Sequence, residues 1–362
     1  MRYHTCVESG RHRLAWIKAF FARVVLLILV MAGAVCVQPA HGQAYPSKPI
    51  RVLLPYAAGG VSDVLVRGVN EMVSEALGQT ILIDNRPGAS SQIALLACAK
   101  AAPDGYTLCL TSGEGMSFGP FLFSSLPYDT ERDFAPITNL VKTQGSIVAN
   151  KDAPFNSMKE LIAYAKDKPG VLNAGSWGVA SLAHIYLEWI KNQTGADLVH
   201  VPYKGGGGPL IIAMVAGHVH VSYFAIGQIL VQIRAGKVKA IAVTTPQRSR
   251  YFPNVPTLAE DGLDPGITTW FGLFAPARTP RPIIDRLNAE YVKALRNPAY
   301  HDRVLEPQAF DAAGSSPAEF VEFLKADRSY ASRVVKLVGL RPETADAAAK
   351  TPPAPATVKP GP

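Results

Sequence analysis

The chain repeats one local pattern, in which a short apolar run enters a turn rich in Gly and Ser, and the turn opens a helix. The three copies are LLPYAAGGVSD at 53–63, LIDNRPGASSQ at 82–92 and NAGSWGVASLAH at 173–184. The start of a helix leaves backbone N–H groups without intrahelical partners, at the positive end of the helix dipole. Such a turn can hold an anion without a charged side chain, so the pattern predicts binding of a small anionic ligand.

The first 44 residues have the layout of a secretory signal peptide. Basic residues at 11, 13, 18 and 23 precede an apolar run at 24–37, and small residues stand at 40, 42 and 44. The run is shorter than the roughly 20 residues that span a bilayer, which disfavours a retained anchor. Val35 stands before Cys36, where a lipid-attachment motif needs a small residue. We therefore predict cleavage near Gln43 or Tyr45 and a mature protein in the periplasm.

Half of the formal net charge of +8 comes from this leader. Residues 1–42 contain five basic residues and one acidic residue, so the mature chain carries +4. The mature chain has no Lys/Arg run interleaved with aromatic residues, so we expect no nucleic-acid binding. Its roughly 300 residues suffice for two α/β lobes with separate cores.

Two cysteines remain after cleavage, Cys98 in an expected helix and Cys109 in the following strand. In an oxidising compartment they could form one disulfide. Each also occupies a position where Val or Leu would serve. From the residues alone we favour two small, buried, apolar side chains.

Short apolar runs alternate with helical patterns, as expected of helices that flank mainly parallel sheets. Strands are expected at 50–55, 81–84 and 106–111 in a first lobe, and long helices at 282–296 and 316–337 should return to it. We predict lobe 1 at 45–145 and 269–342, lobe 2 at 146–268, and a disordered Pro/Ala-rich tail at 343–362. The chain would then cross twice between the lobes.

Enzyme motifs are missing from these turns. No G-x-S-x-G elbow occurs, KGGGGP lacks the ending of a P-loop, and PYAAGGVSD lacks G-x-G-x-x-G. His218 and His220 could ligate a metal from one strand, but the sequence places no third ligand beside them, and a solvent-facing strand edge is the alternative. We therefore predict no catalytic residues, no metal and no cofactor.

Taken together, the motifs resemble the Bug family, the extracytoplasmic solute-binding receptors of tripartite tricarboxylate transporters. The matching stretches include YPSKPIRVLLPYAAGGVSD, ALGQTILIDNRPGAS, AAPDGYTLCL, LPYDTERDFAPIT, VHVPYKGGGGP and AGKVKAIAVTTPQRS, and the resemblance covers about residues 45–342. It implies an α/β, two-lobed type II periplasmic-binding fold that closes around a small carboxylate. A monomer that delivers this ligand to a membrane permease is expected.

The resemblance also implies ligand-binding positions on the three turns and on two further loops. Lobe 1 would supply Tyr56, Ala58, Gly59, Gly60, Ser62, Asp63, Ala89, Ser90, Ser91, Ser112 and Gly113. Lobe 2 would supply Ser176, Trp177, Gly178, Ser181, His184, Pro202, Tyr203 and Lys204. Three of these have structural alternatives, because Asp63 could cap its helix, Lys204 could be a solvated charge and His184 could be a packed helix residue.

Three departures from the family pattern bear on the ligand. Family members usually have GAGG where this chain has Gly88-Ala89-Ser90-Ser91, and Trp177 replaces a small or polar residue. The stretch VSYFAIG at 221–227 lacks the acidic residue that could pair with a ligand amino group. An aromatic or hydrophobic carboxylate and an aliphatic di- or tricarboxylate both remain open.

Capture without chemistry is thus the function that the sequence favours. The alternatives are a ligand sensor or accessory protein of a signalling system, and an extracytoplasmic hydrolase. A purely structural envelope protein is disfavoured by three turns with little bulk at their tips.

Overall fold

The computed structural model describes Trp16, Arg23 and residues 45–203 and 206–340. The predicted signal peptide apart from Trp16 and Arg23, the predicted 343–362 tail and Lys204 lie outside this part. The chain divides into two units, 1–45 and 46–362, and every element below belongs to the second unit.

The first sheet has six strands in the order β11-β4-β10-β3-β1-β2. Its members are β1 (Ile50–Leu54), β2 (Ile81–Asn85), β3 (Thr107–Ser112), β4 (Phe134–Thr143), β10 (Thr269–Pro276) and β11 (Phe310–Ala312). Strands β2, β1 and β3 are parallel, β10 runs antiparallel to both β3 and β4, and β11 runs antiparallel to β4. Four strands therefore share one direction, and their carboxyl ends meet at one edge of the sheet.

The second sheet has five strands in the order β7-β6-β8-β5-β9. They are β5 (Gly145–Asn150), β6 (Leu172–Ser176), β7 (Leu198–Pro202), β8 (Val221–Ala225) and β9 (Val238–Val243). Only β5 runs against the others in this sheet. His218 and His220 lie in the turn before β8, which corrects their expected place on a strand. The His220 Nδ1 accepts the backbone N–H of Asn173 at 2.8 Å.

Helices follow the strands, as the alternating pattern predicts. Around the first sheet are α2 (Val61–Leu77), α3 (Gln92–Ala99), α4 (Gly119–Leu122), α9 (Arg281–Leu295), α10 (Pro298–Tyr300) and α11 (Pro317–Val338). Around the second are α5 (Met158–Asp167), α6 (Leu182–Thr194), α7 (Gly207–Val215) and α8 (Ile226–Arg234). Short turns of helix occur at Ala89–Ser91, Glu114–Phe118 and His301–Leu305. Within the described part, none of these helices is long and apolar enough to cross a membrane.

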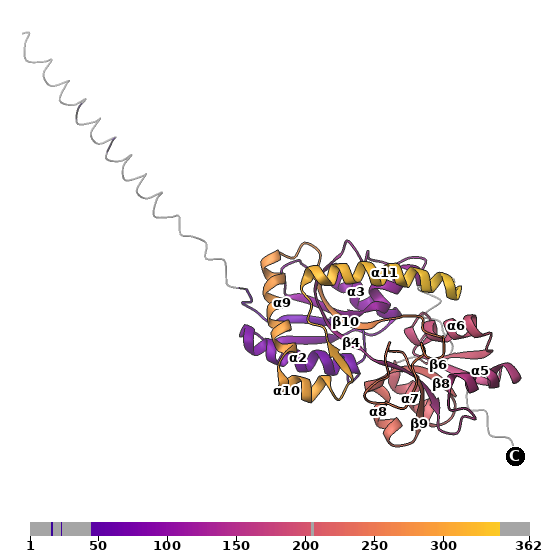
Figure 1. The fold of residues 1–362 in the computed structure, drawn as a ribbon. Helices are drawn as coiled ribbons and strands as arrows, with labels where there is room; N and C mark the ends of the chain where they lie inside the picture. The colour runs from indigo at the N-terminus through magenta and orange to yellow at the C-terminus, as the bar shows by residue number, and fades with distance from the viewer. Residues whose placement is uncertain (1–15, 17–22, 24–44, 204–205, 341–362) are drawn as a thin grey trace, which may run out of the picture. The chain divides into compact units, whose positions relative to one another are not determined.

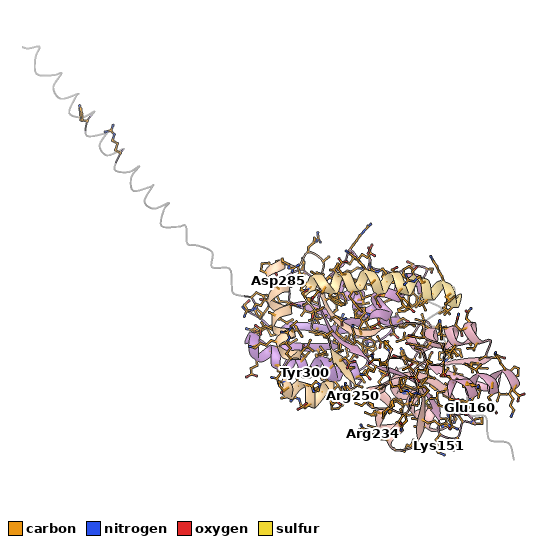
Figure 2. The ribbon with its side chains drawn as sticks, viewed as in Figure 1. Lys151, Glu160, Arg234, Arg250, Asp285 and Tyr300 are labelled. Atoms are coloured by element: carbon orange, nitrogen blue, oxygen red, sulfur yellow. A yellow bond between two sulfur atoms is a disulfide. The ribbon has the colours of Figure 1, made fainter. Side chains whose placement is uncertain are left out.

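The C-terminal elements return to the beginning of the chain, where α9, α10 and α11 lie beside α2 and α3 (Figure 1). Tyr300, labelled in Figure 2, is 1% exposed and donates its hydroxyl to the carbonyl of Leu65 in α2 at 2.8 Å. The exposed side chains of Glu160, Arg234 and Asp285 mark the outer surface in the same view. The first sheet and its helices therefore combine segments from both halves of the chain.

Helix α11 packs against two cores. Its first half contributes Phe320 and Leu324 to a cluster with Trp270 of β10. Its second half, from Ala331 to Val338, belongs to the core that contains α6. A capping box of Ser316 and Glu319 fixes the start of this helix. Helix α11 therefore links elements of both sheets.

Cys98 and Cys109 form a disulfide between α3 and β3, and both are fully buried. Our preference for two unpaired apolar side chains was therefore wrong. The physical reason is that α3 packs on the strand that follows it, which brings two positions only 11 residues apart to a Cα–Cα distance of 6.1 Å.

We expect the double variant Cys98→Ala/Cys109→Ala to lose about 3 kcal/mol of unfolding free energy, since the bridge restricts a loop of this length in the unfolded chain. Urea unfolding of the oxidised protein and of the variant measures this loss. Reductant should destabilise the wild type and leave the variant unchanged. Equal stability of the oxidised and reduced wild type would contradict the prediction.

Candidate functional site

The predicted residues of the first sheet come together where β1, β2 and β3 end. The Tyr56 hydroxyl, after β1, donates to the Ser112 hydroxyl at the end of β3 at 2.7 Å. Asn85 at the end of β2 donates to the Tyr56 carbonyl at 3.0 Å. Carboxyl ends of adjacent parallel strands are where α/β proteins bind ligands. The contacts therefore support a shared site for Tyr56 and Ser112.

The first turn is held from inside by Asp63. Its Oδ2 accepts the N–H of Gly59 at 2.9 Å and the Arg67 Nε at 2.8 Å, while Oδ1 accepts the Asn85 amide at 3.1 Å. Burial opposes ionisation of Asp63, but hydrogen bonds from Arg67, Gly59 and Asn85 outweigh it and lower the pKa. The Asp63 carboxylate thus stabilises the turn through hydrogen bonds to neighbouring groups of the protein. The neighbouring candidates Ala58 and Gly60 are exposed at its tip, and Ser62 is buried beneath them.

Helix α2 begins at this tip without a side-chain cap. Its N-cap residue is Gly60, which has no side chain to accept a hydrogen bond. Helix α3 also begins without a side-chain cap, although its N-cap residue is Ser91. The start of α2 therefore keeps backbone N–H groups for a partner other than a capping side chain, whereas at the start of α3 the Gln92 N–H already donates to the Ala89 carbonyl.

The second turn has a left-handed backbone at four successive residues. The φ angles are 123° at Gly88, 44° at Ala89, 49° at Ser90 and 77° at Ser91. Left-handed backbone costs a residue with a Cβ roughly 1–2 kcal/mol, so glycine would be less strained than Ala89, Ser90 or Ser91 here. Strain of this kind gathers at functional turns. Ser90 is exposed and Ser91 is buried, so the two hydroxyls have different surroundings.

The third turn, after β6, is a network around two hydroxyl groups. The Ser176 hydroxyl lies 2.6 Å from the His200 Nε2, 2.9 Å from the Gly178 carbonyl and 3.1 Å from the Gly178 nitrogen. Ser181 caps α6 by accepting the N–H of His184. The chain after β7 joins this network, because Tyr203, next to Pro202, donates its N–H to the Ser176 carbonyl at 2.8 Å. Six of the predicted second-lobe residues are therefore neighbours, namely Ser176, Gly178, Ser181, His184, Pro202 and Tyr203.

His184 and His200 stack on each other, with ring centres 4.0 Å apart and an angle of 13° between planes. Burial is the main cause that lowers the pKa of His184 to about 4 and of His200 to about 3. The Glu188 carboxylate lies 3.8 Å from the His184 Nε2 and does not reverse this shift. Both rings are therefore neutral at pH 7. No local sequence pattern points to His200, whose partners are distant in sequence.

Glu114, which is not among the predicted site residues, joins the turns of the first sheet to the turn after β6. It follows Ser112 and Gly113 after β3, and its Oε1 accepts the Leu182 N–H at 2.7 Å and the Trp177 indole N–H at 3.1 Å. Burial raises the pKa of Glu114, and these two hydrogen bonds oppose the rise. Burial is the largest cause that raises the pKa of Tyr56, and the charge of Glu114 is the second. The signal available in the sequence was an acidic residue one position beyond the predicted Gly113.

Trp177 packs beside one further aromatic side chain, that of Tyr223 in β8. Its ring centre lies 6.0 Å from that of Tyr223, and both Trp177 and Tyr203 border the same apolar core cluster. Trp177 remains partly exposed. Trp177 thus contacts Glu114 directly, and the charge of Glu114 is one of the causes, after burial, of the raised pKa of Tyr56 and of Tyr223.

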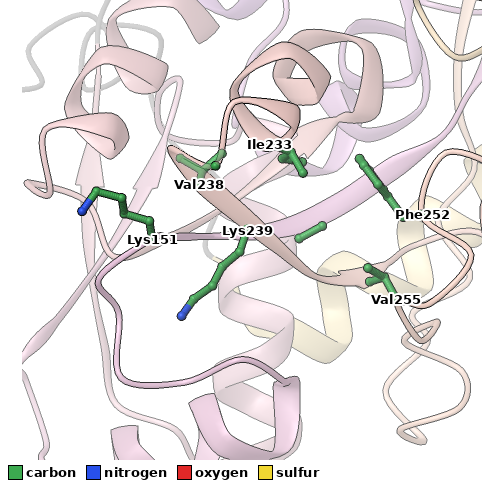
Figure 3. Close-up of a pocket in the computed structure, with 8 residues that line it drawn as sticks. Lys151, Ile233, Val238, Lys239, Phe252 and Val255 are labelled. Atoms are coloured by element: carbon green, nitrogen blue, oxygen red, sulfur yellow. The ribbon is translucent and has the colours of Figure 1, made fainter.

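A cavity of about 450 Å³ lies elsewhere, and none of the predicted residues lines it. Its apolar wall includes Ile233, Phe252 and Val255 (Figure 3). The ammonium groups of Lys151 and Lys239 point away from this wall, toward Asp152 and toward the Ala153 carbonyl and Asn156. Both ammonium groups therefore already have partners within the protein, and we do not assign the ligand to this cavity.

The Ser176–His200 contact deserves comparison with a hydrolase, because 2.6 Å is a nucleophile-to-base distance. Ser176 is fully buried, and its hydroxyl is already shared with Gly178. A substrate would have no access to this oxygen. The pair therefore fits a structural network better than a catalytic one.

The sequence matches the tripartite tricarboxylate transporter family receptor over residues 65–340. BugT from Bordetella pertussis is 34% identical over 296 residues, which are 81% of this chain and 88% of BugT. The structure of the periplasmic binding protein BugD is similar with a TM-score of 0.76 and 28% identity, covering 83% of this chain and all of BugD. MatC from Rhodopseudomonas palustris with bound malate is similar with a TM-score of 0.75 and 30% identity, covering 80% of this chain and all of MatC.

These similarities confirm the expected family and the expected two-lobed α/β fold, in which each sheet forms the centre of one lobe. They give positive evidence for a binding protein and not an enzyme, because the family is defined as a receptor. The chain belongs to the receptor family of the tripartite tricarboxylate transporters and has the fold of the periplasmic binding proteins.

Proposed function

We propose that the protein is a periplasmic receptor that captures a small carboxylate between its lobes and delivers it to a membrane permease. The observation that carries this proposal is Glu114, whose carboxylate accepts the first N–H of α6 and the Trp177 indole N–H. The turn after β6 therefore has donors placed to bind a carboxylate. The malate bound to MatC supports the same ligand chemistry.

The two remaining turns would bind the ligand from lobe 1. Helices α2 and α3 start without side-chain caps, beside the hydroxyls of Tyr56 and Ser112. The ligand would stabilise a closed arrangement that the free protein already samples. Lobe boundaries at 145 and 268, the residues of the site and a monomeric state are part of this proposal.

A thermal-shift screen of the mature protein against aliphatic and aromatic mono-, di- and tricarboxylates and amino acids tests the proposal. A ligand at roughly 100 times its Kd should add about 2.7 kcal/mol to the unfolding free energy. Trp177→Ala should reduce the shift, whereas Lys159→Ala, at an exposed position of α5, should keep it.

The absence of any shift in refolded protein, which has lost ligand carried through purification, would contradict carboxylate capture. A sensor or accessory protein would keep the same site and bind a different membrane partner. Co-purification with a permease of the tripartite type supports delivery, and capture of a signalling protein in its place would favour the sensor.

A further inference from the structure

We propose that Glu114 determines the class of ligand: its own carboxylate fills the anion position at the start of α6, so the receptor takes a monocarboxylate and rejects the matching dicarboxylate. This inference rests on the proposed capture function. It assigns to Glu114 a role in specificity, which differs from a general role in holding the lobes together.

The first step is that the position at α6 is occupied. Leu182 is the first residue of α6, and its N–H points at the Glu114 Oε1 across 2.7 Å. The Trp177 indole supplies a second donor to the same oxygen. Ser181 accepts the N–H of His184 in the same helix turn. A ligand carboxylate could therefore bind here only after displacing Glu114.

The second step is that comparable positions are open in lobe 1. Gly60 and Ser91 are the N-cap residues of α2 and α3, and neither makes a side-chain hydrogen bond to its helix. One ligand carboxylate can thus be satisfied there by backbone donors. The two lobes differ in this respect, because the helix start in lobe 2 is filled by a carboxylate of the protein itself, that of Glu114 from lobe 1.

The third step concerns charge and surface around Glu114. Among the described residues, Glu114 forms no salt bridge, and its charge is met by the two N–H donors and the positive end of α6. A second ligand carboxylate beside it would meet a like charge, which strongly disfavours binding. Tyr56 and Trp177, both partly exposed, offer aromatic surface near Glu114 instead. The part of the ligand farthest from its carboxylate should therefore be uncharged.

The test compares two matched probe pairs, hexanoate with adipate and benzoate with terephthalate, by calorimetric titration of the mature protein. For the pair that fits the site, the wild type should bind the monocarboxylate at least about tenfold more tightly. Glu114→Ala should vacate the position and shift the ratio of affinities toward the dicarboxylate by about tenfold or more.

Glu114→Gln is the matched control, because its amide oxygen can still accept both N–H groups without a charge. It should shift the ratio toward the dicarboxylate by less than Glu114→Ala does, because it removes the like charge but keeps the position filled. Trp177→Phe removes one donor to Glu114 and should shift the ratio in the same direction as Glu114→Ala, by a smaller factor. This variant keeps the test available if Glu114→Ala fails to fold.

The outcomes separate the inference from the proposed function. A wild type that prefers the dicarboxylate, or a ratio that neither Glu114→Ala nor Trp177→Phe changes, overturns the inference and leaves capture standing. Binding of a dicarboxylate by Glu114→Ala alone supports the inference. No binding of any probe by wild type or variants overturns the proposed function, and the inference falls with it.

Discussion

Lowering the pH from 8 to 5 is expected to remove about 3 kcal/mol of unfolding free energy through the stacked pair His184 and His200. Each ring has a folded pKa below the ordinary value of 6.5, at about 4 and about 3. A depressed pKa gives stability that is present above pH 6.5 and is lost as the pH falls toward the folded value. At pH 5 each ring accounts for about 2 kcal/mol, reduced for His200 because it is partly exposed.

Urea unfolding at pH 8 and pH 5 measures this loss, and the variants separate the pair from the other titrating groups. His200→Gln removes one of the two rings and should roughly halve the loss that the pair causes, whatever its effect on stability at pH 8. His218→Gln, an exposed histidine before β8, is the matched control and should retain the full loss. An unchanged pH dependence in His200→Gln would show that the stack does not store this free energy.

Replacing Trp270 with Ala is expected to cost about 4 kcal/mol of unfolding free energy. Trp270 is 1% exposed in β10, and its ring packs edge-on against Phe320 and Phe323 of α11 at 5.5 and 5.6 Å. Its indole N–H donates to the buried Asp327 at 2.9 Å. The substitution therefore leaves a cavity and also removes one hydrogen-bond donor from a carboxyl group whose pKa burial already raises.

Trp270→Phe separates the two contributions, because it keeps most of the ring and loses only the hydrogen bond. Its expected cost is about 1–2 kcal/mol, again read from urea unfolding. Trp270 also lies next to the candidate site. Its Nε1 would be 3.2 Å from a Cβ added to Gly113, the residue before Glu114. A loss below about 1 kcal/mol in Trp270→Ala would mean that α11 repacks into the space.

Much of the fold was predictable because its signals are local. Helix α2 follows from apolar residues at helical spacing, and it ends at Gly78, whose φ of 66° suits a glycine. Strands β4 and β10 were not predicted, and they pair with each other along most of their length. More than a hundred residues separate them, and a stretch such as FAPITNLVKT has no alternation that marks it as a central strand.

The candidate site was also predictable only where its signals are local in the sequence. The three turns were recognised from Gly and Ser at the starts of helices, and the structure confirms that helices begin at two of them directly, at Val61 and Gln92, and at Leu182 after the third. The partners of these turns were not recognised. Glu114 lies 68 residues before Leu182, and His200 meets His184 only because β7 pairs with β6.

The sequence by itself determined the family, the alternation of strands and helices, and the position of three turns able to bind an anion. These properties depend on caps, glycines and periodicity within a few residues. Only the tertiary structure decided that Glu114 fills one of the three helix starts, that two histidines are buried as a neutral stack, and that Cys98 pairs with Cys109. Such contacts depend on how helices and strands pack, and packing is decided by the whole chain and not by any short segment.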